Sequence, residues 1–369
     1  MKIAVLTSSR ADYGIYLPLL RAMKADTFFD LRLIAFGTHL SEAYGNTVEL
    51  IEKDGFTIDH RIEVMPANDS PDEISAAIGR TTQAFSHIWS QSKYDLVLAL
   101  GDRFEMFAAV VSGVPFNIRF GHIHGGETTL GAIDDAFRHS ITLMSSVHFA
   151  CAEAYKERII QIRGDSNLVF NTGALSIDLL ASCELMKQEE FMECYGVDLS
   201  QPTILSTLHP ETVSYEKNIL LAEAFAEALL LLPGFQLVIT MPNADTFGKV
   251  IREKLQQLKQ LRKGVHLFEN LGSIGYLSCM KYAKMLIGNT SSGFYDASYF
   301  PKWVINLGVR QKGRIRTPNI IDLEFNPASI AETARKIAGL PVPEFEPVYG
   351  KGDAAAKMIK ILKNEFTTH

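Results

Sequence analysis

The sequence predicts an α/β protein made of two doubly wound domains, each with a parallel sheet covered by helices. Its 369 residues exceed the roughly 250 to 300 residues at which a single hydrophobic core stops growing. Short apolar segments rich in β-branched residues alternate with segments of helical periodicity, in two separate series. Polar loops follow the apolar segments, and in sheets of this kind ligands bind beyond the ends of the strands.

The first series begins with a buried strand over residues 2–7, indicated by the apolar sequence KIAVLT. In the helix that follows, apolar residues recur at helical spacing, namely Tyr16, Leu19, Leu20 and Met23. Further strands are predicted over 31–36, 95–100, 117–120 and 146–151. The sequence DLVLAL at 95–100 is apolar enough to be buried on both faces, which is typical of a parallel sheet.

A polar, helix-prone stretch over 176–200 connects this series to the second one. Strands are then expected over 203–208, 235–240, 265–270, 284–289 and 303–308. In the last helix we expect Asp353 to cap the N-terminus. An apolar stripe follows it, formed by Ala355, Met358, Ile359, Leu362 and Phe366. We therefore expect an N-terminal domain of residues 1–172 and a C-terminal domain of residues 173–352.

The composition argues against several classes of function. A net charge of -6 with dispersed Lys and Arg residues gives no support to binding of nucleic acid or of a membrane surface. No apolar run reaches the ~20 residues that span a bilayer, and the first strand is not typical of a signal peptide. The cysteines lie far apart without CxxC pairs, which favours reduced thiols in a cytoplasmic protein.

The stretch 122–139, HIHGGETTLGAIDDAFRH, combines histidines, carboxylates and a glycine pair directly after an apolar strand. The glycines permit a sharp turn that would bring Glu127 and Asp134 toward one space, near Asp102 at the end of another strand. Several carboxylates and a histidine around one site can separate the pKa values of an acid and a base. The alternative is that Asp134 or the adjacent Asp135 only caps the following helix.

A second candidate is the sequence GNTSSG at 288–293, between a strand and a helix. Small residues there let backbone N–H groups approach an anion, and the candidate contacts are Thr290, Ser291, Ser292 and Gly293. The pattern is neither a Walker motif nor a dinucleotide fingerprint, so a tight turn with a serine cap is the alternative. Asp296, one turn later, could accept hydrogen bonds from ribose hydroxyls.

Arginines in two loops are suited to bidentate contact with phosphate. Arg310 lies in a basic loop after the strand at 303–308, and Arg10 lies in the first loop of the chain. A solvated basic loop is the alternative for Arg310. His39 also follows a strand, and Tyr276 is a candidate neighbour for a nucleotide base, although most such aromatics are only packed.

His209, in the sequence TLHPET, is a further candidate because Pro210 fixes the turn after it. A metal is not expected. His122 and His124 have a possible ligand spacing on an extended segment, but a third ligand such as His209 would have to come from the other domain.

Taken together, these motifs resemble the hydrolysing UDP-N-acetylglucosamine 2-epimerases of sialic-acid synthesis. The motifs occur in the family's order over nearly the whole chain: SSRADYG, GTHLSEAYGNT, LGDRFE, HIHGGE, IDDAFRHSI, TLHPET, IGNTSSG and INLGVRQKGR. The resemblance implies a GT-B-like fold, with two Rossmann-like domains and the active site in the cleft between them. It also implies that the C-terminal domain binds UDP and that the last helix, 353–369, crosses back to the N-terminal domain.

The implied reaction converts UDP-GlcNAc and water to UDP and N-acetylmannosamine through 2-acetamidoglucal, without a cofactor, in a protein expected to be a homodimer. The positions that match catalytic residues or their neighbours are Asp102, Glu127, Asp134 and His209. Those that match UDP-binding residues are Arg10, Tyr276, Thr290, Ser291, Asp296 and Arg310. We add further expected substrate contacts at His39, Arg103, His124, Ser292 and Gly293.

Two positions depart from the family pattern. His124 stands where several relatives have Glu, as HIEGGE, so the base that removes the C2 proton is left open. Asp296 stands where many relatives have Glu, which shortens the expected contact with the ribose. HIHGGE resembles the bacterial sialic-acid members, which favours UDP-GlcNAc as the substrate. UDP-N,N'-diacetylbacillosamine is the alternative substrate. A GT-B glycosyltransferase and a nucleotide-sugar sensor without turnover are the alternative functions.

Overall fold

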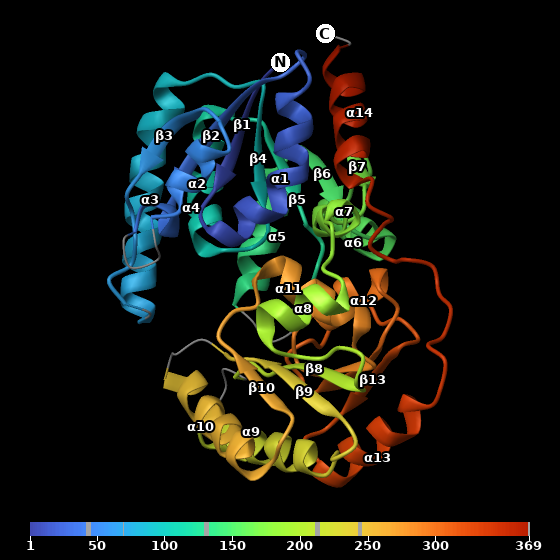
Figure 1. The fold of residues 1–369 in the computed structure, drawn as a ribbon. Coiled ribbons are helices and arrows are strands. Elements are labelled where there is room, and N and C mark those ends of the chain that lie inside the picture. The colour runs from blue at the N-terminus through green and yellow to red at the C-terminus, as the bar shows by residue number, and fades with distance from the viewer. Residues whose placement is uncertain (42–45, 69, 129–132, 211–214, 243–245, 368–369) are drawn as a thin grey trace. The chain divides into compact units, whose positions relative to one another are not determined.

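The computed structural model describes residues 1–41, 46–68, 70–128, 133–210, 215–242 and 246–367. The chain divides into two compact units. Unit 1 consists of Met1–Ala181 and Val348–His369, and unit 2 consists of Ser182–Pro347. Each has a parallel sheet whose strands alternate with helices (Figure 1), which confirms the predicted α/β class with two doubly wound domains.

The sheet of unit 1 has the strand order β3-β2-β1-β4-β5-β6-β7. Its strands are β1 (Lys2–Thr7), β2 (Asp30–Phe36), β3 (Ile58–Ile62), β4 (Leu96–Leu100), β5 (Phe120–Ile123), β6 (Val147–Ala150) and β7 (Val169–Asn171). Its helices are α1 (Arg10–Lys24), α2 (Val48–Lys53), α3 (Pro71–Gln91), α4 (Phe104–Gly113), α5 (Asp134–Met144), α6 (Glu153–Arg163), α7 (Leu175–Ser182) and α14 (Ala354–Thr367). The direction of the strand order reverses between β1 and β4.

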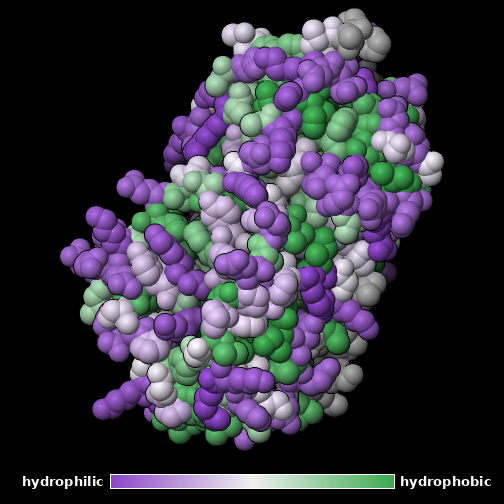
Figure 2. Space-filling model, turned by 90° about the vertical axis from the view of Figure 1, so that its right-hand side faces the viewer, coloured by the Kyte–Doolittle hydropathy of each residue, from purple (hydrophilic) through white to green (hydrophobic). Residues whose placement is uncertain are grey.

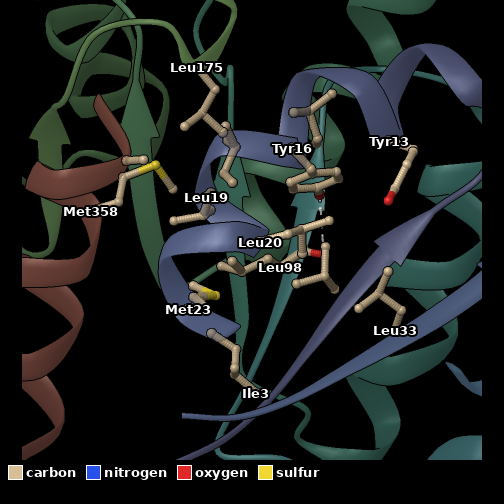
Figure 3. Close-up of a cluster of buried hydrophobic side chains, with 14 of the residues drawn as sticks. Ile3, Tyr13, Tyr16, Leu19, Leu20, Met23, Leu33, Leu98, Leu175 and Met358 are labelled. Atoms are coloured by element: carbon tan, nitrogen blue, oxygen red, sulfur yellow. Dashed lines mark hydrogen bonds between the residues drawn. The ribbon is translucent and has the colours of Figure 1, made fainter. Parts of the chain in front are cut away.

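The apolar stripe of α1 is the centre of one layer of the core of unit 1. Tyr16, Leu19, Leu20 and Met23 are completely buried, as predicted. Figure 3 shows them between the strands of the sheet and Met358 of α14. Because burying one such side chain contributes about 1.5 to 3 kcal/mol, this layer is a major source of stability for unit 1.

A carboxylate far away in the sequence caps α14. Asp178 of α7 accepts hydrogen bonds from the backbone N–H groups of Ala354 at 2.8 Å and Ala355 at 2.6 Å. Asp353, the predicted cap, directly precedes α14, and its carboxylate pairs with Lys357 at 2.9 Å. This link also explains why the division between the units falls at 181/182 instead of the expected 172/173, since α7 is tied to α14.

The sheet of unit 2 has the strand order β10-β9-β8-β11-β12-β13. Its strands are β8 (Thr203–Thr207), β9 (Gln236–Thr240), β10 (Val265–Phe268), β11 (Met285–Gly288), β12 (Trp303–Leu307) and β13 (Ile320–Leu323). Its helices are α8 (Gln188–Tyr195), α9 (Tyr215–Leu230), α10 (Thr246–Leu261), α11 (Gly272–Tyr282), α12 (Asp296–Tyr299) and α13 (Pro327–Ala338). Here the strand order reverses between β8 and β11.

Several sequence-based elements require correction. The strand predicted over 117–120 begins only at Phe120, because Asn117 has a φ of 55° and ends a short 3-10 turn. His122 therefore lies within β5 and not in the loop after it. The edge strands β3, β7 and β13 were not predicted, since each is short or carries few buried side chains.

The surface view in Figure 2 shows hydrophilic side chains interspersed with several separate hydrophobic areas. No helix in the described part of the chain is long and apolar enough to cross a membrane. Two of the four cysteines, Cys151 and Cys279, are buried.

Candidate active site

Predicted site residues gather at the point in each sheet where the strand order reverses. In unit 1 Arg10 begins the helix after β1 and Asp102 lies in the loop after β4, and in unit 2 the loops after β8 and β11 carry His209 and Thr290. Neighbouring chain segments leave such a point in opposite directions, which creates the usual ligand crevice of a doubly wound sheet.

The guanidinium of Arg138 organises the site residues of unit 1. Arg138 lies one turn into α5, and its side chain is 5% exposed. It pairs with the Asp102 carboxylate, lies 3.1 Å from Glu127 Oε2, and donates to the His124 carbonyl at 3.3 Å. Because a buried cation is stable only when it is paired, Arg138 joins the end of β4, the loop after β5 and α5 into one network.

Glu127 is buried behind this network. Its Oε1 lies 2.7 Å from His124 Nδ1 and accepts a hydrogen bond from the Cys151 thiol at 3.2 Å. The turn that brings it there requires Gly126, whose φ is 77° and whose missing Cβ would lie 2.2 Å from the Tyr155 carbonyl oxygen. His124 itself has a φ of 64°. Because both of its carboxylate oxygens already contact protein groups, Glu127 is better suited to orient other side chains than to contact a ligand.

The same three side chains include donors that could hold a metal ion. Ligand atoms of His124, Glu127 and Cys151 lie within 4.8 Å of one another, and imidazole, carboxylate and thiolate are all zinc ligands. However, the Glu127 carboxylate already pairs with the Arg138 guanidinium. A divalent cation would have to be held beside that positive charge and would break the His124 contact, so the donor set fits an ion-pair network better than a metal centre.

Asp102 and Asp134 are the carboxylates of this network with access to solvent. The side chain of Asp102 is 24% exposed, and Asp134 is exposed at the start of α5. Surrounding protein atoms and the charge of Asp102 raise the pKa of Asp134, whereas Arg138 and Arg103 oppose this shift.

Arg103 and His39 have different surroundings, although both were expected to contact substrate. Arg103 pairs with the buried Glu105 at 2.7 Å. The negative charges of Glu105, Asp12 and Asp134 raise the pKa of Arg103. His39 is completely buried, and its ring nitrogens lie 2.8 Å from the hydroxyl oxygens of Thr7 and Thr47. A ligand could reach the His39 ring only if one of these hydrogen bonds broke.

Arg10 begins α1 and is exposed. His122, in contrast, is part of the buried structure. Its ring lies between the Thr142 hydroxyl and the Gly101 carbonyl, and burial lowers its pKa to about 3. The conspicuous histidines of the 122–139 stretch therefore differ in role, and residues 129–132 of that stretch lie outside the described residues.

In unit 2 a polar cluster surrounds Asp296. The Ser292 hydroxyl donates to Asp296 Oδ2 at 2.6 Å, and burial raises the pKa of Asp296 to about 6 against the effect of this bond. Burial also raises the pKa of the nearby Tyr276, and hydrogen bonding with the side chains of Ser292 and Thr207 opposes this shift. Thr290 caps the 3-10 turn Ser291–Gly293 by accepting from Ser292 N–H. The structure thus brings together five of the predicted contacts, namely Tyr276, Thr290, Ser291, Ser292 and Asp296.

A second cluster of unit 2 contains His209 and Arg310. The side-chain amide of Asn289 binds the backbone of His209, and the Asn289 carbonyl accepts from Arg310 at 3.2 Å. Neither Asn289 nor Arg138 was among the predicted site residues. The position of Asn289 at a strand end and the four-residue spacing between Asp134 and Arg138 were the available signals for them.

Two doubly wound units with polar loops at their switch points form an architecture in which nucleotides commonly bind at those points. A family model described as UDP-N-acetylglucosamine 2-epimerase matches residues 21–363. The chain therefore belongs to the UDP-N-acetylglucosamine 2-epimerase family.

Individual relatives agree with this assignment. A Campylobacter jejuni protein named GDP/UDP-N,N'-diacetylbacillosamine 2-epimerase (hydrolyzing) is 38% identical over 328 residues, covering 88% of this chain and 85% of the relative. The Escherichia coli polysialic acid biosynthesis protein P7 is 35% identical over 323 residues, covering 87% and 82%. The fold matches a solved UDP-GlcNAc 2-epimerase from Neisseria meningitidis bound to UDP-GlcNAc with a TM-score of 0.83 at 19% identity, covering 99% of this chain and 100% of that one. The chain is thus an enzyme of the epimerase family with the GT-B-like fold.

Proposed function

We propose that the protein is a hydrolysing 2-epimerase that converts a UDP-linked 2-acetamido sugar and water into UDP and the free 2-epimer. The observation that carries this proposal is the network around Arg138, in which Arg138 pairs with Asp102 and the charges of both act on Asp134. Family membership supplies the reaction class.

The first chemical step is an elimination. The C2 hydrogen of the sugar is hardly acidic because no carbonyl group is attached to C2, so cleavage of the C1–O bond to UDP leads and positive charge develops at C1. In this proposal Asp102, whose carboxylate pairs with Arg138, stabilises that charge. The C2 proton then leaves to a base and a C1=C2 double bond forms.

Asp134 is the carboxyl group best suited to exchange this proton. A general acid or base works best when its pKa lies near the working pH, and the pKa of Asp134 is raised. In the second step a water molecule adds its hydroxyl group to C1. C2 receives a proton on the face opposite to the one from which the first proton was removed, which inverts the configuration at C2. Glu127, engaged by Arg138 and His124, acts by positioning these side chains and not by contact with the sugar.

Unit 2 binds the UDP portion in this proposal. Asp296 and Tyr276 are candidates for the nucleoside, while Arg310 and the 290–293 turn are candidates for the diphosphate. His209 would donate a hydrogen bond to the leaving diphosphate as its charge develops.

Two substrates are compatible with this chemistry. The sequence HIHGGE favours UDP-GlcNAc, whereas the name of the relative at 38% identity favours UDP-N,N'-diacetylbacillosamine. The two sugars share the 2-acetamido group, which the reaction requires, and differ at C4 and C6. We retain both as candidates.

The proposal is tested by following each UDP-sugar by NMR after incubation with the protein in deuterated water. We expect free UDP and a 2-epimeric sugar with deuterium at C2, because rehydration takes its proton from solvent. Turnover that requires an acceptor alcohol would indicate a glycosyltransferase. Binding of both UDP-sugars without UDP release or exchange at C2 would indicate a sensor.

A further inference from the structure

Asn289 forms an unusual connection with the loop that carries His209. It follows β11 directly, is completely buried, and uses both atoms of its side-chain amide on one residue. Asn289 Oδ1 accepts from the His209 backbone N–H at 2.7 Å, and Nδ2 donates to the His209 carbonyl at 2.8 Å. Pro210 then restricts His209 to extended backbone conformations.

The two hydrogen bonds fix the orientation of the amide. A backbone N–H can only donate and a carbonyl can only accept, so one orientation of the Asn289 side chain satisfies both groups. An ionised aspartate at this position would set an oxygen against the His209 carbonyl. An alanine would leave both backbone groups without these partners.

The backbone of the same residue holds a second loop. The Asn289 carbonyl accepts from Gln311 Nε2 at 2.8 Å and from Arg310 Nη1 at 3.2 Å. The approach of β11 to β8 at this point requires Gly288, because a Cβ there would lie 2.0 Å from the Thr207 carbonyl oxygen. One buried residue therefore joins the loops that follow β8, β11 and β12.

We propose that Asn289 is the positioning residue for His209 and ties its position to that of Arg310. This rests on the proposed function, in which both side chains act on the leaving diphosphate. His209 and Arg310 both hydrogen-bond to Asn289. The distance between the His209 side chain and a diphosphate bound by Arg310 would therefore be fixed. A displacement of about 1 Å at a reacting group can cost on the order of 100-fold in rate.

The test compares Asn289→Ala, His209→Ala and the double variant in the full chain. We expect Asn289→Ala to lower kcat about 10- to 100-fold, with the Kd for UDP by calorimetry changed by less than about 3-fold. In the His209→Ala background the same substitution should have almost no further effect, because Asn289 acts through the imidazole. Equal losses of kcat in both backgrounds would overturn the proposal.

A second variant covers the case in which Asn289→Ala does not fold. In Asn289→Asp the introduced carboxyl group can restore the hydrogen bond to the His209 carbonyl only when protonated. The ratio of its kcat to that of the wild type should therefore rise as the pH falls. A ratio independent of pH contradicts the proposal.

Asn319→Ala provides the matched control. Asn319 is a completely buried asparagine of unit 2 that donates to the Lys302 carbonyl at 2.6 Å. Its loss should lower stability and leave kcat within about 3-fold, as for a structural residue. A kcat loss in Asn319→Ala equal to that in Asn289→Ala would reduce Asn289 to a structural role. Wild-type protein that releases no UDP from either UDP-sugar would instead refute the proposed function.

Discussion

Asp102, Glu127 and Asp134 show how far single residues could be placed from the sequence. The prediction that they share one space is consistent with their common neighbour Arg138, with which Asp102 and Glu127 pair. Arg138 itself was missed because a helical arginine usually lies at the surface. It is buried among its contacts with Asp102, Glu127 and the His124 carbonyl, and sequence periodicity does not report such contacts.

Replacement of Asp102 tests the proposed charge stabilisation at C1. Asp102→Asn removes the negative charge and keeps the size, so we expect turnover to fall at least ~100-fold while UDP binding is nearly kept. Steady-state UDP release and UDP calorimetry measure the two effects. Asp165→Asn is the control, because Asp165 is an exposed carboxylate 3.4 Å from Arg163 and its loss should leave turnover unchanged. Full activity in Asp102→Asn would remove Asp102 from the mechanism.

Asp296 makes stability depend on pH. Because burial raises its pKa from 3.8 to about 6, the carboxyl group ionises in the unfolded chain at a lower pH than in the folded protein. Ionisation of Asp296 therefore lowers the free energy of unfolding as the pH rises from about 4 to 6, and the full loss is present above pH 6. We expect Asp296→Asn to be more stable than the wild type by about 1 to 2 kcal/mol at pH 7.5, allowing for partial exposure, and equally stable at pH 4. Denaturant unfolding at both pH values measures the difference, and equal stabilities at pH 7.5 would show that Asp296 carries no such penalty.

At the scale of elements, helices with long apolar stripes were predicted well, and caps and edge strands were not. The stripes of α1 and α14 follow from periodicity alone. The cap of α14 does not, since Asp178 precedes its hydrogen-bond partners by 176 and 177 residues. The adjacent Asp353 fits the local pattern equally well. A sequence pattern cannot rank a remote carboxylate above a local one, because the choice depends on how α7 packs beside α14.

The two aspartates provide a direct comparison. Asp178→Ala leaves the first N–H groups of α14 without their carboxylate, so we expect a loss of about 2 kcal/mol in the free energy of unfolding. Asp353→Ala removes only an exposed pair with Lys357 and should cost less than about 0.5 kcal/mol. Denaturant unfolding of both variants, with hydrogen exchange of the α14 amides, distinguishes them. Similar losses in the two variants would mean that Asp353 shares the capping role.

At the scale of the whole molecule, unit 2 is one continuous segment, whereas unit 1 is completed by the C-terminal residues. The buried face of α14 belongs to the same apolar cluster as α1. Burial of Met358 and Leu362 alone contributes about 3 to 6 kcal/mol, which is comparable with the total stability of many domains. The last helix is therefore part of the core of unit 1 and not an appended segment.

Removal of residues 348–369 should consequently abolish turnover, which depends on unit 1, and leave UDP binding by unit 2. We expect unit 1 to lose its cooperative unfolding transition, because α1 loses the apolar partner of its stripe and Asp178 loses both N–H donors. Turnover should disappear with it, since Asp102 and Asp134 lie in that unit. UDP binding should persist, because the proposed UDP contacts lie in unit 2 except for Arg10, which is exposed. Calorimetric titration of the shortened chain with UDP, beside an assay of UDP release, measures both properties. Loss of UDP binding together with turnover would show that unit 2 depends on the C-terminal segment or that unit 1 supplies essential UDP contacts.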